Sequence, residues 1–196
     1  MNEQRMLARV GAISGIVFPV ALFAASCHHA YPVGLIAILF FVPFASFLHS
    51  LLRRAEGTNG WLSTAAFVAG LMGITIKLVS VVPELAKNEV TKGTALYTAL
   101  DHMAGMATVI SLWPLAFMLA MVALLTLRSH ALPRPLGYFA AVTAVALAVN
   151  GSFLHAEFVP ALLLFLLWTL VTSIVLLRKT RPVPATATQA NATVTA

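Results

Sequence analysis

The sequence predicts an all-α integral membrane protein, a bundle of six transmembrane helices with both termini cytoplasmic. Of its 196 residues, 60% are hydrophobic and 9% are charged, whereas soluble domains carry about 25% charged residues. The apolar residues form six long stretches, and a hydrocarbon core of about 30 Å needs roughly 20 residues of helix to cross it. Helices are expected because open strands would leave backbone groups unpaired in lipid.

The six predicted spans are joined by short connections. They cover approximately residues 10–26, 33–52, 62–82, 100–127, 136–153 and 159–177. Proline and glycine occur inside several of them, as at Pro43 and Pro114, which membrane helices tolerate because neighbouring helices satisfy the freed backbone groups. Residues 1–181 are therefore expected to form one membrane domain. Residues 182–196 are rich in Pro, Ala and Thr, lack an apolar period and are expected to be a flexible cytoplasmic tail.

Basic residues predict the orientation of the bundle, because Lys and Arg near the ends of spans stay on the cytoplasmic side. One predicted side receives Arg5, Arg9, Arg53, Arg54, Arg128, Arg134, Arg178, Lys179 and Arg181. Both termini are therefore expected in the cytoplasm. The net charge of +6 is assigned to this excess. It predicts contact with the anionic headgroups of the lipid bilayer rather than with nucleic acid.

Polar residues recur on one face of the third span and on one face of the fourth. An ionisable residue inside a span is costly and is a functional hypothesis by default. Spacings of three and four place Gly70, Gly73, Lys77, Ser80 and Glu84 on the first of these faces, and Thr94, Tyr97, Asp101, Gly105 and Thr108 on the second. We expect Lys77 to pair with Asp101 or Glu84 across the two helices. Such a pair either orients the helices or serves a ligand.

The predicted ligand-binding site is an outward-facing polar cavity. It is expected to be lined by Lys77, Glu84, Asp101, His102, Asn150 and Glu157. The cavity would bind or transport a small solute or a lipophilic molecule. No metal site and no cofactor are predicted, because the sequence contains no HExxH, GxGxxG or phosphate-loop motif.

Two alternatives to a solute-binding protein stay open, so enzyme activity is uncertain at this point. The first is an intramembrane enzyme of cyclase or isomerase type, in which Glu84, Asp101 or Glu157 donates a proton to an apolar substrate. The second is a non-catalytic helical subunit, held to a membrane partner or to another copy of itself by the face that carries Gly70 and Gly73.

Two further predictions concern single residues. The run that ends in Cys27 resembles a lipoprotein signal, but five spans follow it and Ala24 stands where that signal prefers Leu. A retained first helix is therefore favoured over cleavage and acylation at Cys27. Trp113 and Trp168 lie deep in their spans and are expected to pack between helices, whereas the other aromatic residues are typical of the membrane interfaces.

A short motif resembles a known family. The segment Leu132-Pro133-Arg134-Pro135-Leu136-Gly137 resembles the "LPRWLG" junction of small multi-pass proteins of actinobacteria, and the six-span plan is similar to the domains of unknown function called DUF4386. The resemblance implies a membrane location and a bacterial origin. It implies no catalytic residue.

Overall fold

The computed structural model describes residues 2–28, 31–57, 60–154 and 159–179. Its helices are α1 (Asn2–His28), α2 (Tyr31–Glu56), α3 (Trp61–Lys87), α4 (Ala95–Ser129), α5 (Arg134–Val149) and α6 (Val159–Lys179). A short π-helix, η1 (Asn150–Leu154), continues α5. All six helices are long and apolar enough to cross a membrane. The predicted helical membrane bundle is confirmed, while Glu157, the predicted tail and the side chain of Cys27 lie outside the described part.

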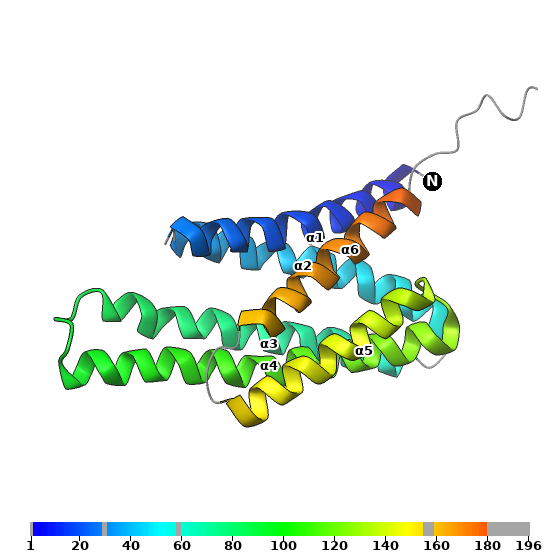
Figure 1. Ribbon diagram of the computed structural model, residues 1–196. Coiled ribbons are helices and arrows are strands. Elements are labelled where there is room, and N and C mark those ends of the chain that lie inside the picture. The colour runs from blue at the N-terminus through cyan, green and yellow to red at the C-terminus, as the bar shows by residue number, and fades with distance from the viewer. Residues whose placement is uncertain (1, 29–30, 58–59, 155–158, 180–196) are drawn as a thin grey trace, which may run out of the picture.

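The helices form two hairpins that are joined by the last two helices. α1 pairs with α2 and α3 pairs with α4, while α5 packs on α4 and α6 crosses back to α1 (Figure 1). The start of α1 and the end of α6 lie at the same end of the bundle. We call this the arginine end, because it carries Arg9, Arg53, Arg54, Arg128, Arg134 and Arg178. The opposite end, which holds the α3–α4 connection at residues 88–94, is called the loop end.

Aromatic side chains hold the first and last helices together. The ring of Phe41 on α2 lies 5.3 Å from that of Phe18 on α1 and 6.1 Å from that of Phe165 on α6, measured between centroids. Trp168 is fully buried, and its Nε1 donates a hydrogen bond of 3.2 Å to the carbonyl of Leu136 at the start of α5. The indole thus fills the core and satisfies its own donor, as buried tryptophans usually do.

The two deep tryptophans have opposite environments. The prediction that Trp168 packs inside is confirmed, but the prediction for Trp113 is wrong, because its side chain is 52% exposed. Trp113 shares an exposed stripe of α4 with Met106, Ile110 and Phe117. Residues at this spacing lie on one face of a helix. In a membrane that face meets acyl chains, so an apolar ring is as stable there as in the core.

Small residues bring α3 and α4 close together. A Cβ atom added to Gly70 would lie 2.7 Å from the Sδ of Met118, and one added to Gly73 would lie 2.7 Å from the Cγ of Leu115 and 3.1 Å from the carbonyl oxygen of Ser111. The predicted small face of α3 is therefore filled by α4 of the same chain. It is not open to a partner, and the partner contact predicted for the subunit hypothesis is wrong.

The α3–α4 hairpin is longer than the sequence predicts. α3 continues past the predicted end at 82 to Lys87, and α4 starts at Ala95 rather than at 100, so the hairpin projects beyond the other helices at the loop end (Figure 1). Hydropathy marks only the part of a helix that lies in hydrocarbon. Beyond it, Thr94 caps α4 by accepting a 3.2 Å hydrogen bond from the backbone N–H of Tyr97.

Candidate functional site

Lys77 and Thr108 form a polar contact between α3 and α4, and a buried serine follows each of them three residues later in its own helix. The Nζ of Lys77 donates a 2.7 Å hydrogen bond to the Oγ1 of Thr108. The Oγ of Ser80 donates to the carbonyl of Lys77, and the Oγ of Ser111 donates to that of Thr108. Lys77 is half-buried, whereas Thr108, Ser80 and Ser111 are buried. The sequence-predicted faces of the two helices therefore do meet, and Thr108 is an acceptor for Lys77.

The position of Lys77 along α3 places it at membrane depth. Trp61, which is 62% exposed at the start of α3, is typical of a residue at the membrane interface. At about 1.5 Å of rise per residue, Lys77 lies about 24 Å further along the helix. That distance falls within a hydrocarbon layer of about 30 Å. An ammonium at this depth is destabilising unless polar groups surround it.

The acids that we expected to meet Lys77 bind Lys87 instead. The Nζ of Lys87 lies 3.0 Å from Glu84 Oε1 and 2.7 Å from Asp101 Oδ1, and 5.7 Å from the ring centroid of Tyr97. Lys87 is one turn from Glu84, whereas Lys77 is about 10 Å from Glu84 along the helix axis. The sequence-based boundary at 82 assigned Lys87 to a loop and hid this partner. The salt bridge to Asp101 ties α3 to α4 at the projecting loop end, whereas the one to Glu84 lies within α3.

Replacing Asp101 with Asn should weaken the projecting hairpin only slightly. Asp101 is exposed, and exposed salt bridges contribute little to stability because water and salt screen them. We expect a small fall in the melting temperature at low salt that disappears in molar sodium chloride. The control is Glu89→Gln, another exposed acid at the loop end. A loss that persists at high salt would show that Asp101 acts through something other than its charge.

Of the remaining predicted cavity residues, His102 and Asn150 lie in the described part of the chain, and Glu157 lies outside it. His102 is exposed, and Asn150 is buried, at 2% exposure, in η1. η1 packs on α4, where a Cβ on Gly151 would lie 3.2 Å from the Trp113 ring. π-Helical insertions frequently occur at functional sites.

The described polar contacts between α3 and α4 fall into two groups. Lys77 and Thr108 form one polar site. Glu84, Lys87 and Asp101 form a separate one nearer the loop end.

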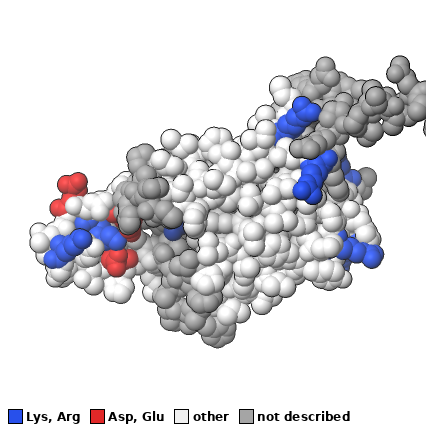
Figure 2. All heavy atoms as spheres, turned by 45° about the horizontal axis from the view of Figure 1, so that its top comes forward, with Lys and Arg blue, Asp and Glu red and all other residues white. Residues whose placement is uncertain are grey.

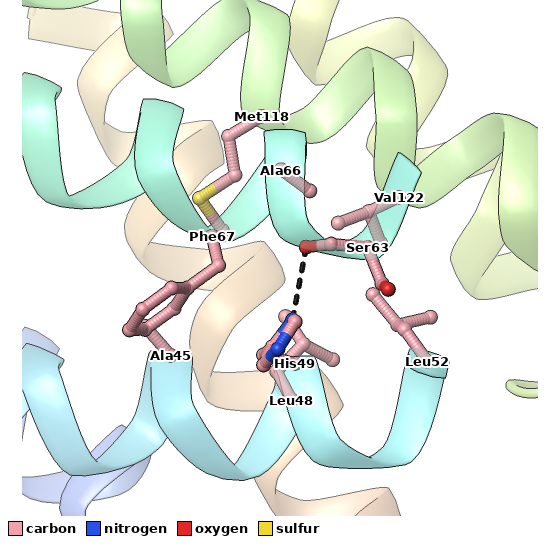
Figure 3. Close-up of a pocket in the computed structure, with 9 residues that line it drawn as sticks. All are labelled: Ala45, Leu48, His49, Leu52, Ser63, Ala66, Phe67, Met118 and Val122. Carbon is pink, nitrogen blue, oxygen red and sulfur yellow. Dashed lines mark hydrogen bonds between the residues drawn. The ribbon is translucent and has the colours of Figure 1, made fainter. Parts of the chain in front are cut away.

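A small pocket at the arginine end was missed by the sequence analysis. It opens between α2, α3 and α4, and Figure 3 shows its lining, including His49 and Phe67. The Nδ1 of His49 donates to the carbonyl of Ser63 at 3.1 Å, and its ring stacks on Phe67 at 5.1 Å. The pocket has room for about one water molecule. The sequence did contain a signal for this pocket, because His49 is an ionisable residue inside the second predicted span.

Glu56 closes the α2–α3 turn beside this pocket. Its Oε1 accepts a hydrogen bond from the backbone N–H of Leu62, and its Oε2 accepts one from that of Ser63, both at 2.9 Å. These N–H groups belong to the first turn of α3, where backbone donors have no acceptor within the helix. The negative carboxylate also compensates the positive end of the helix dipole. Glu56 therefore positions Ser63, the residue that binds His49.

Comparisons of the chain with protein-family models, curated proteins and solved structures found no match. Function is therefore argued from the chemistry of the site. An ammonium supplies three hydrogen-bond donors, and a hydroxyl can donate and accept. A site built from the Lys77 ammonium and the Thr108 hydroxyl is suited to a polar solute that accepts hydrogen bonds.

Proposed function

We propose that this multi-pass membrane protein binds a small polar solute at the Lys77 site and transports it across the bilayer. The observation that carries the proposal is the hydrogen bond of 2.7 Å between Lys77 Nζ and Thr108 Oγ1, formed between two helices at membrane depth. A lysine there is retained at a cost in stability. The Thr108 hydroxyl beside it offers a further polar contact to a solute that has left water.

An intramembrane enzyme with a carboxylic acid as proton donor is the weaker candidate. Glu84 and Asp101 both bind Lys87, so neither is held ready for an apolar substrate. Asp101 is also exposed, at 59% of its side-chain surface, whereas a general acid for an apolar substrate works best away from water. For these two acids the contacts favour binding and transport over acid catalysis, and Glu157, the third predicted proton donor, lies outside the described residues.

We also propose that the protein lies in the cytoplasmic membrane of a bacterium with the arginine end in the cytoplasm. On the face shown in Figure 2, the charged atoms at that end are blue, whereas the loop end carries both blue and red atoms. An excess of Arg and Lys at one end favours its retention in the cytoplasm. The resemblance of residues 132–137 to actinobacterial membrane proteins supports the same location.

The test is a thermal-shift screen of the detergent-purified protein against small carboxylates, phosphates, sugars and amino acids. We expect at least one of these classes to raise the melting temperature of the wild type and not that of Lys77→Met. The substitution keeps a long apolar stem but removes the ammonium. Thr108→Val, which removes the acceptor and keeps the shape, should reduce the same shift.

The matched control is Lys92→Met, because Lys92 is an exposed lysine in the α3–α4 connection. Its solute response should equal that of the wild type. Equal responses of Lys77→Met and the wild type, or no response to any class, would contradict the proposal. A large loss of stability in Lys77→Met without any solute would show that the lysine is needed for helix packing, and would also count against it.

A further inference from the structure

The corner between α4 and α5 gathers exposed basic side chains at the arginine end. Arg128 lies in the last turn of α4, His130 caps that helix with a left-handed backbone at φ 57°, and Arg134 begins α5. The guanidinium of Arg134 donates to His130 Nε2 from Nε at 3.0 Å and from Nη2 at 2.7 Å. This contact holds Arg134 back over the turn. All three side chains are exposed.

No described carboxylate is available to neutralise this corner. Among the acids whose side chains the structure describes, Glu56 is the one at the arginine end, and its two oxygens are bound to the backbone of α3. The described acids Glu84, Glu89 and Asp101 lie in the hairpin at the loop end. Within the described part of the chain, no acid therefore pairs with the positive charge of this corner.

An exposed apolar stripe on α5 leads away from the corner. Tyr138, Val142, Val145 and Val149 are each at least 46% exposed, and their spacing of three and four residues puts them on one face. The stripe ends about 22 Å from Arg134, at about 1.5 Å per residue. One leaflet of the hydrocarbon core is about 15 Å deep. The stripe is therefore long enough to follow an acyl chain through a leaflet, with Tyr138 near the headgroup.

We propose that the α4–α5 corner binds an anionic phospholipid of the adjoining leaflet. The phosphodiester lies between Arg128 and Arg134, since guanidinium groups bind phosphate oxygens with two parallel hydrogen bonds. An acyl chain lies along Tyr138 and the valines. The partner is a lipid rather than a free phosphate, because Arg134 lies four residues before Tyr138 and so shares the face of α5 that carries the apolar stripe. This lipid site is independent of the solute site at Lys77.

Native mass spectrometry of the full-length protein in detergent tests the proposal with short-chain phosphatidylglycerol as the probe. The double variant Arg128→Gln/Arg134→Gln should bind it about 30-fold more weakly, since each cation near the surface contributes about 1 kcal/mol and about 1.4 kcal/mol is a factor of ten. Arg134→Lys keeps the charge but loses the paired hydrogen bonds, and it should give an intermediate affinity. Arg9→Gln/Arg54→Gln removes two exposed arginines elsewhere at the same end and should bind like the wild type.

Three outcomes would overturn the proposal. Equal losses in both double variants would mean that the whole basic rim attracts lipid without a local site. Equal binding of phosphatidylcholine would remove the selectivity for an anion. Equal binding of glycerol phosphate, which has the headgroup without acyl chains, would show a phosphate site and no contact with the stripe. Melting curves of each variant without lipid confirm that it is folded before binding is measured.

Discussion

Gly73→Val is expected to destabilise the bundle by about 3 kcal/mol, the upper part of the range for overpacked cores. A Cβ at this position would lie 2.7 Å from Leu115 Cγ and 3.1 Å from the carbonyl oxygen of Ser111. Leu115 is buried and the carbonyl belongs to the α4 backbone, so α3 and α4 must move apart. Separation would also disturb the contact between Lys77 and Thr108, about one turn further along α3. Unfolding by sodium dodecyl sulfate in mixed micelles measures the loss.

The matched control for this prediction is Gly105→Val on α4. A Cβ at Gly105 would meet no atom within 4 Å, so the same substitution should change the free energy of unfolding by no more than about 0.5 kcal/mol. Solute binding at the Lys77 site should fall in Gly73→Val and persist in Gly105→Val. A stable Gly73→Val variant would contradict the close approach of α3 and α4 on which the site depends.

Glu56→Ala is expected to cost about 2 kcal/mol, because it removes a charged acceptor from two backbone donors at the start of α3. Those donors, the N–H groups of Leu62 and Ser63, each lie 2.9 Å from the carboxylate. Glu56→Gln keeps one acceptor oxygen and should lose about half as much stability. Unfolding in the same mixed micelles measures both variants.

Glu89→Ala is the control for the loss of an acid, because Glu89 is exposed near the end of the α3–α4 hairpin. Its free energy of unfolding should stay within about 0.5 kcal/mol of the wild type. If Glu56→Ala were equally harmless, the carboxylate would not be the cap of α3. Loosening of this turn should also weaken the hydrogen bond between Ser63 and His49.

The contacts of α3 show how far helical spacing carries a sequence-based prediction. The spacing of Gly70, Gly73 and Lys77 identified the face that packs against protein, because residues three and four apart always share a face of a helix. It did not say which helix would fill that face. The residues that do so, Met118, Leu115 and Thr108, lie more than thirty positions away in the sequence.

The ion pairs show a second limit. Hydropathy ended the third span at 82, but α3 runs to Lys87 and brings that lysine to Glu84 and Asp101. The length of a helix outside hydrocarbon depends on caps and side-chain pairs, which an average of hydropathy does not register. Averaged hydropathy also placed Trp113 deep in a span, but it did not show whether the side chain faces the protein core or the lipid.

By itself, the sequence determined that this chain forms six membrane helices, where they lie approximately, and which end collects the arginines. These properties follow from the free energy of transferring side chains and backbone from water into hydrocarbon. That free energy depends on the composition of each segment and not on its neighbours in the fold. The tertiary structure alone decided that Lys77 meets Thr108, that Lys87 joins the acids and that His49 faces a pocket. Those contacts depend on which helices become neighbours and on their relative depth, and both are set by packing between distant segments.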